Sequence, residues 1–122
     1  MQVLLGIGGS DDAFLALERT VDRVQLTGDQ LTVAVLENPT ATLAPDAIAE
    51  RVHDRLDEAA IDATVRRVEG EPGAALVTMA DTEGFDEIVL GGGQESPMGK
   101  IDVGRIAEYV VLNATVTVTL VR

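Results

Sequence analysis

The sequence predicts an α/β fold, a doubly wound parallel sheet with helices on both faces. Strand-like and helix-like runs alternate along residues 1–122, which we expect to form a single domain. The strand-like runs are almost continuously apolar, as in strands buried on both faces, whereas the runs between them repeat apolar residues every three or four positions. Right-handed crossovers between such units give a parallel sheet, and ligands bind such sheets outside the carboxyl ends of the strands.

The first half of the chain contains two strand–helix units. Residues 1–7 form the first strand, which ends at a pair of glycines. Ser10 is expected to cap the first helix, because its hydroxyl can accept a hydrogen bond from a first-turn N–H. Residues 31–36 form the second strand, and Pro45 is suited to the first turn of the second helix. The residues expected to face the core are Phe14, Leu17, Val21 and Val24 in the first helix and Ile48, Val52 and Leu56 in the second.

The second half contains two further units and a final strand. The third strand, residues 63–68, mixes apolar and basic residues, so we expect it at an edge of the sheet. The third helix ends at Gly84, residues 87–90 form the fourth strand, and the fourth helix starts near Gly104. Residues 115–121 form the last strand. The apolar helix faces are Ala75, Leu76, Met79 and Ala80 in the third helix and Val103, Ile106, Ala107, Val110, Val111 and Ala114 in the fourth.

Acidic residues outnumber basic residues by 21 to 9, which gives a formal net charge of -12. Nucleic-acid grooves and anionic membrane surfaces need clustered Lys and Arg, so neither is an expected partner. Lys100 is the only lysine among the basic residues. This profile favours a halophilic protein, whose surface carboxylates stay hydrated while salt screens their repulsion; an ordinary acidic cytosolic protein is the alternative.

Several functional classes are disfavoured by composition. No segment approaches the roughly 18 consecutive apolar residues of a membrane-spanning helix, and no leader-like pattern is present, so we expect a cytoplasmic protein. The sequence has no cysteine, and its one histidine, His53, has no metal-ligating partner at helical spacing. We therefore expect no catalytic residue and no metal site.

A glycine-rich stretch, residues 91–104, connects the fourth strand to the fourth helix. Glycines let backbone N–H groups approach a ligand, and the positive dipole end of the following helix favours an anion. We expect a loop of about ten residues here, with an anion nest around Gln94. Because Gly8 also follows a strand, a nucleotide site is expected between these two segments. A tight connection without a ligand is the alternative.

Two standard phosphate motifs do not fit this stretch. The Gly-Lys pair at 99–100 is preceded by Gln94 where a P-loop requires glycine, and Ile101 takes the place of its hydroxyl residue. The dinucleotide fingerprint fails because Asp11 and Ser96 stand where its third glycine would be.

Three motifs instead resemble the universal stress protein family. Residues 5–10 are similar to that family's first strand and its Val-Asp-Gly-Ser turn, and residues 68–72 to its Val-Glu-Gly-x-Pro junction. Residues 88–91 and the spacing to Gly104 resemble its Gly-x2-Gly-x9-Gly-Ser/Thr loop, and residues 96–114 look most like haloarchaeal members. The resemblance covers essentially the whole chain. It implies an adenine nucleotide alpha hydrolase-like fold with five parallel strands in the order 3-2-1-4-5.

The resemblance implies only part of the family's nucleotide site in this sequence. It implies that Gly91 and Gly104 match the first and last loop glycines and that Val35 offers its backbone to an adenine. The complete set of implied cofactor-binding residues is Gly8, Val35, Leu90, Gly91, Gly93, Gln94, Gly104, Arg105 and Ile106.

Three of these positions depart from the family pattern. Gly8 replaces an aspartate that holds the adenosine moiety, a loss of about 1.5–3 kcal/mol if nothing substitutes for it. Gln94 replaces the middle glycine, and Arg105 replaces a Ser/Thr that bonds a phosphate. The Arg105 guanidinium either contacts the phosphates or pairs with Asp102 or Glu108 on the surface.

The resemblance leaves two main hypotheses for function. The first is a small regulatory stress-response protein with a degenerate adenine-nucleotide site for ATP. The second is a stress protein that does not bind ATP and acts through dimerisation and protein contacts, and an enzyme acting on an adenine nucleotide is a third alternative. A homodimer through the last strand, residues 115–122, is implied under either main hypothesis. We expect Gly8→Asp with Arg105→Ser to raise ATP affinity, and Gly91→Val to block the ligand with little unfolding.

Overall fold

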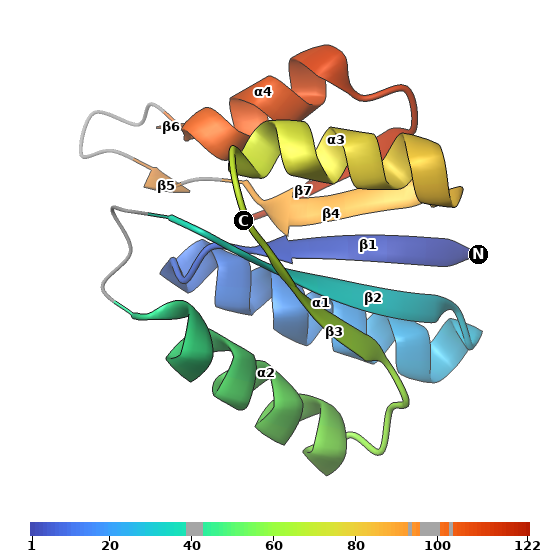
Figure 1. Cartoon of the computed structure of the whole chain (residues 1–122). Helices are drawn as coiled ribbons and strands as arrows, with labels where there is room; N and C mark the ends of the chain where they lie inside the picture. Colours follow the sequence, from blue (N-terminus) through green and yellow to red (C-terminus); the bar gives the residue numbers. More distant parts are fainter. Residues whose placement is uncertain (39–42, 93, 96–100, 103) are drawn as a thin grey trace.

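The computed structural model describes residues 1–38, 43–92, 94–95, 101–102 and 104–122. Within them, five parallel strands form one sheet in the order β3-β2-β1-β4-β7, which confirms the predicted order (Figure 1). The strands are β1 (Gln2–Ile7), β2 (Gln30–Leu36), β3 (Thr64–Val68), β4 (Glu87–Gly91), β5 (Gln94–Glu95), β6 (Ile101–Asp102) and β7 (Thr117–Val121). The helices are α1 (Asp11–Thr27), α2 (Pro45–Glu58), α3 (Pro72–Glu83) and α4 (Arg105–Asn113).

The helices cover both faces of the sheet. In Figure 1, α1 and α2 lie on one face and α3 and α4 on the other. Two apolar clusters result, because the central strands β1, β2 and β4 send side chains to both faces. All seven core residues predicted in α1 and α2 are buried: Phe14, Leu17, Val21, Val24, Ile48, Val52 and Leu56.

The prediction of a loop of about ten residues between Gly91 and Gly104 is wrong in one respect. β5 and β6 form a short antiparallel pair, with Gln94 opposite Asp102, beyond the carboxyl end of β4 (Figure 1). Two-residue strands are too short for periodicity to reveal. Gly93 and residues 96–100 lie outside the described residues.

Two details of the predicted helices also differ. Ser10 precedes α1 in an extended conformation, but its hydroxyl makes no capping hydrogen bond, and its backbone carbonyl accepts from Ala13 and Phe14. Val111 does not face the core, because its exposed fraction is 50%. A Cβ built on Gly73 of α3 would lie 2.8 Å from the Tyr109 ring, so α4 packs closely against α3 at this point.

The two edges of the sheet differ in character. β3 is an edge strand, as predicted, and two of its arginines pair with neighbouring acids: Arg66 with Glu83 at 2.5 Å and Arg67 with Asp46. Such charges protect an edge from pairing with another chain. β7 forms the opposite edge, and most of its residues are half-buried. Within the described residues, no helix is long and apolar enough to cross a membrane.

Candidate nucleotide site at the carboxyl end of the sheet

The strand order reverses between β1 and β4, which are neighbours at the centre of the sheet. Ile7 pairs with Val35 in the last rung between β1 and β2, so the carboxyl ends of these strands lie together. Gly8 directly follows β1, and Gly91 is the last residue of β4. The structure therefore brings Gly8, Val35 and Gly91 to one end of the sheet, where open α/β sheets bind ligands.

Gly8 is covered by Asn38, which follows β2. The Asn38 amide nitrogen Nδ2 donates a hydrogen bond of 3.1 Å to the Gly8 carbonyl oxygen. A Cβ built on Gly8 would lie 3.3 Å from this nitrogen and 3.5 Å from the Asn38 Cβ. An aspartate at position 8 therefore requires Asn38 to shift.

Gly91 is the point of closest approach between β4 and α1. A Cβ built there would lie 2.8 Å from the Ala13 amide nitrogen, the Asp12 carbonyl carbon and the Asp12 carboxylate oxygen Oδ2. Real Cβ atoms essentially never come so near to backbone atoms. Any side chain at this position therefore requires α1 to shift, which argues against the expectation that Gly91→Val causes little unfolding.

The backbone beyond Gly91 is bound into the sheet. The Gly92 N–H donates to the Val121 carbonyl oxygen at 2.7 Å and so extends the ladder between β4 and β7. Gln94 pairs with Asp102 in the β5-β6 ladder. An anion nest needs neighbouring N–H groups that converge on one point, and a ladder does not provide this. The predicted nest around Gln94 would include Gly93, which lies outside the described residues, so the nest stays a prediction.

The remaining predicted residues divide into core and surface. Leu90 and Val35 have exposed fractions of 3% and 1%, so only their backbone can face a ligand. Ile106 is half-buried and packs against the core cluster. Gly104 is the N-cap of α4 with a φ of 82°, a conformation that favours glycine, and Arg105 starts the helix with an exposed side chain.

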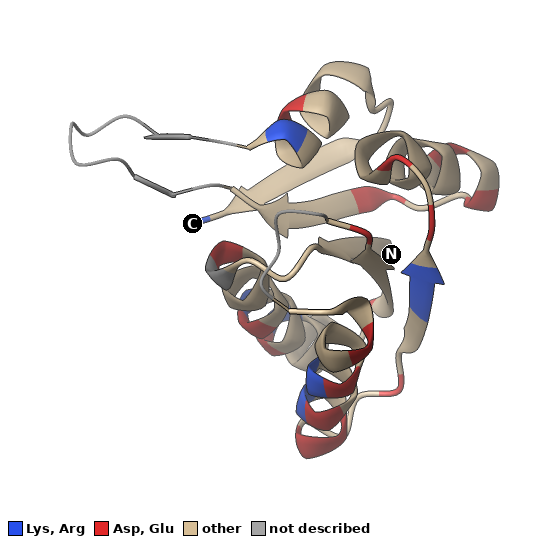
Figure 2. Ribbon diagram, turned by 60° about the vertical axis from the view of Figure 1, so that its left-hand side comes forward, with Lys and Arg blue, Asp and Glu red and all other residues tan. Residues whose placement is uncertain are grey.

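Positive charge at this end of the sheet comes from arginines that are not neutralised nearby. Arg23, Arg55, Arg66 and Arg67 form ion pairs with carboxylates, and Arg51 stacks on the Phe14 ring at 3.7 Å. In the part of the chain that the structure describes, neither Arg105 nor Arg122 forms an ion pair. On α1 and α2, acidic and basic residues are interleaved (Figure 2).

Two residues near the site have no predicted role. Asn38 lies two residues after β2, and a polar residue close to the carboxyl end of a central strand is a signal for a site. The Arg122 side chain lies beside Gly92, since a Cβ built on that glycine would be 2.8 Å from the arginine Cγ. Nothing in local periodicity indicates this contact, which depends on the pairing of β7 with β4.

Other parts of the surface offer alternatives to this site. A groove of about 450 Å³ lies between α1 and α2 and is lined by Phe14, Leu15, Leu17, Glu18, Arg51, Asp54, Arg55 and Glu58. Over the described ranges, no group of three or more His, Asp or Glu side chains is placed to hold a metal ion. His53 is exposed on α2.

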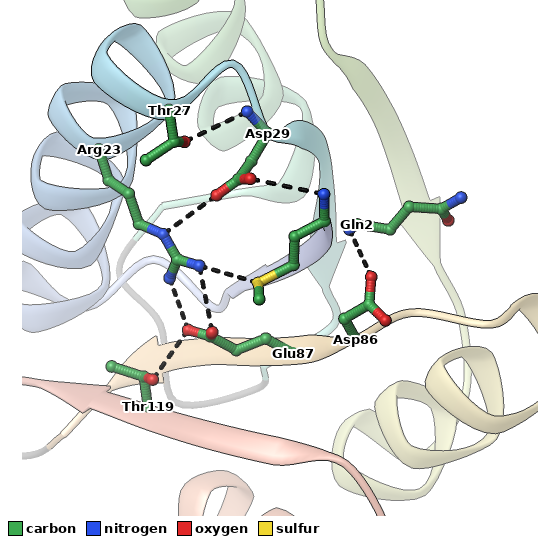
Figure 3. Close-up of polar contacts among 8 residues, drawn as sticks. Gln2, Arg23, Thr27, Asp29, Asp86, Glu87 and Thr119 are labelled. Carbon is green, nitrogen blue, oxygen red and sulfur yellow. Dashed lines mark hydrogen bonds and ion pairs between the residues drawn. The ribbon is translucent and has the colours of Figure 1, made fainter.

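A buried polar cluster occupies the opposite, amino end of the sheet (Figure 3). Glu87 on β4 is 6% exposed and accepts hydrogen bonds from Arg23 at 2.7 and 3.2 Å and from the Thr119 hydroxyl at 2.8 Å. The Arg23 hydrogen bond is the main cause that lowers the pKa of Glu87, although burial opposes it. Arg23 also contacts Asp29 at 3.3 Å. The cluster therefore links α1, β4 and β7.

Comparison with known proteins identifies the class to which this fold and site belong. The model of the universal stress protein family matches residues 1–122. The chain therefore belongs to the universal stress protein family. No curated protein matches the sequence.

Solved structures with the same fold cover the whole chain. A universal stress protein crystallised in complex with cAMP is 27% identical, with a TM-score of 0.78 over 100% of this chain and 96% of that one. A universal stress protein from Archaeoglobus fulgidus in complex with dAMP is 21% identical, with a TM-score of 0.72 and coverage of 100% and 98%. A protein of the family from Arabidopsis thaliana with AMP bound is 13% identical, with a TM-score of 0.74 and coverage of 99% and 90%.

Proposed function

We propose that this stress protein binds an adenine nucleotide at the carboxyl end of the sheet, between the turn after β1 and the start of α4. The observation that carries the proposal is the full-length similarity, at 27% identity, to a universal stress protein in complex with cAMP. The complexes of two further structural neighbours with dAMP and AMP support the same ligand class. The role we propose is regulatory binding, without catalysis.

The residues present fit the nucleoside end of such a ligand better than a long phosphate chain. Gly8 and Asn38 stand at the strand ends, and the backbone of Val35 lies beside them. For the phosphate, the site offers the exposed Arg105 at the N-terminus of α4, where charge and helix dipole act together. The Gly92 N–H already donates to the Val121 carbonyl in the sheet, so it does not donate to a phosphate. We therefore propose AMP or cAMP as ligands ahead of ATP.

Thermal unfolding with and without nucleotide tests this function. In molar KCl, AMP at 100 times its dissociation constant should stabilise the protein by about 2.7 kcal/mol, which raises the midpoint by several degrees. Arg105→Glu should abolish most of this shift, whereas Arg19→Glu, on an exposed position of α1, should leave it unchanged. Absence of a shift with millimolar AMP, cAMP and ATP would refute the proposal.

A second function, action through dimerisation, is favoured by a specific feature of α4. Tyr109, Val111 and Leu112 of α4 have exposed fractions of 40%, 50% and 74%, and β7, the strand that follows α4, is an edge strand of the sheet. Exposed apolar side chains and an edge strand are both features of interfaces. We propose a homodimer through residues 115–122, and sedimentation equilibrium of the wild type should give twice the monomer mass.

We also propose that the protein is adapted to high salt, like the haloarchaeal members that its sequence resembles. Its net charge of -12 implies strong self-repulsion at low ionic strength. The unfolding midpoint should therefore rise between 0.1 M and 2 M KCl. A midpoint that falls over this range would contradict the adaptation.

A further inference from the structure

The feature that carries a further inference is the Arg122 side chain, which lies over the end of β4. A Cβ built on Gly92 would be 2.8 Å from the Arg122 Cγ and 3.0 Å from the Leu120 Cβ. Leu120 packs against the apolar cluster that α3 and α4 cover, whereas Val121 packs against the cluster on the other face. Arg122 therefore lies on the α4 face of the sheet, and the glycine at position 92 leaves room for its side chain.

The strand registers place Arg122 level with the proposed nucleotide site. Leu5 of β1 pairs with Val89 of β4, and Gly91 of β4 pairs with Val121 of β7. Continued beyond the strand ends, these registers bring Gly8, Gly92 and Arg122 to the same level. Gly8 and Arg122 are then two strand spacings apart, about 10 Å, a distance that one nucleotide can bridge.

Arg105 lies at the same end and on the same face of the sheet. It is the first residue of α4, and Ile106 beside it packs against the same apolar cluster as Leu120. The start of α4 and the end of β7 lie on the same side of the molecule (Figure 1). Arg105 and Arg122 are both exposed, and within the described residues neither guanidinium forms an ion pair.

Two guanidinium groups without carboxylate partners favour a ligand group that carries two negative charges. Each guanidinium offers a planar fork of N–H donors that matches the geometry of phosphate oxygens. A terminal 5′-phosphate carries close to two negative charges at neutral pH and has three free acceptor oxygens. A cyclic phosphodiester carries a single negative charge and has only two free oxygens. AMP can therefore engage both arginines more fully than cAMP can.

We propose that Arg122 and Arg105 together bind the phosphate of the nucleotide and that they select a terminal 5′-phosphate over a cyclic phosphodiester. This inference rests on the proposed nucleotide function. It adds a specificity-determining residue, Arg122, from a strand that the proposed site does not otherwise use. It also narrows the ligand from AMP or cAMP to AMP.

Titration calorimetry with AMP and cAMP tests this selection in the wild type and two variants. Arg122→Gln keeps the Cγ that lies against Gly92 and removes the charge. Arg19→Gln is the matched control, because it removes the same charge from an exposed position of α1. The wild type should bind AMP roughly tenfold more tightly than cAMP, Arg122→Gln should lose most of this preference, and the control should keep it.

The ratio of the two affinities separates phosphate recognition from a structural role. An arginine that only covers the end of β4 would weaken AMP and cAMP equally when replaced, so an unchanged ratio in Arg122→Gln would overturn the inference. A wild type that binds AMP and cAMP equally well would also overturn it and leave the proposed function intact. A wild type that binds neither nucleotide would refute the proposed function and the inference together.

Discussion

Replacement of Glu87 by glutamine should destabilise the protein far more than the same change at a surface glutamate. The Glu87 carboxylate accepts two hydrogen bonds from Arg23 and one from Thr119, inside a cluster that joins three elements (Figure 3). Glutamine retains the shape and one oxygen acceptor. Its NH2 group, however, is a donor and faces a guanidinium that can also only donate, so at least one hydrogen bond to Arg23 is lost.

The expected loss is about 2–3 kcal/mol of unfolding free energy. A hydrogen bond to a charged group contributes roughly 1.5–3 kcal/mol, and breaking a fully buried ion pair costs about 3–5 kcal/mol. The expected loss lies below the value for a fully buried ion pair because the Arg23 side chain is 32% exposed and water can hydrate it. With an unfolding entropy of about 2.1 cal/mol/K per residue, this loss lowers the midpoint by about 8–12 °C.

Urea unfolding of the wild type, Glu87→Gln and Glu83→Gln measures this difference. Glu83 pairs with Arg66 on the surface, where both side chains are about 40% exposed, so the control should lose less than about 1 kcal/mol. Raising KCl from 0.1 M to 1 M should reduce the effect of the control and leave that of Glu87→Gln almost unchanged. Equal losses in the two variants would refute the role assigned to the buried cluster.

Three further predictions concern the pH dependence, the glycine at the end of β4 and the exposed face of α4. Because the pKa of Glu87 is lowered in the folded state, the contribution of its carboxylate to the free energy of unfolding is complete above the ordinary pKa of 4.5 and is lost as pH falls through the folded pKa. Urea unfolding that shows no loss of unfolding free energy between pH 5 and pH 3 would contradict this. Gly91→Ala should lower the unfolding free energy by about 1–3 kcal/mol, because its Cβ meets the backbone of α1, and wild-type stability in urea would refute that packing. Leu112→Glu should weaken the proposed homodimer at least tenfold in sedimentation equilibrium, and an unchanged dissociation constant would exclude the outer face of α4 from the interface.

The order of the elements and the core of α1 and α2 could be predicted because they depend on local patterns. Continuous apolar runs mark the central strands, and the spacing of Ile48, Val52 and Leu56 marks a helix with one buried face. Val111 was misplaced by the same reasoning. Its exposure of 50% depends on how α4 packs against the rest of the fold, which local spacing does not determine.

The candidate site was predictable in location but not in detail. Strand ends and glycines predict that Gly8 and Gly91 meet at the carboxyl end of the sheet, and the structure places them there. The role of each glycine depends instead on long-range contacts: Gly91 meets α1, the Gly92 N–H bonds Val121, and Gly8 is covered by Asn38. The last two contacts join residues 29 and 30 positions apart, so no local motif could reveal them.

The most direct test of the nucleotide site is an NMR titration of the isotope-labelled wild type with AMP, read as backbone amide shifts. A site at the carboxyl end of the sheet predicts that the largest shifts cluster at Gly8, Asn38, Gly91 and Arg105, with little change at Glu87. Shifts confined to the groove between α1 and α2, around Phe14 and Arg51, or no saturable shifts at millimolar AMP, would contradict it.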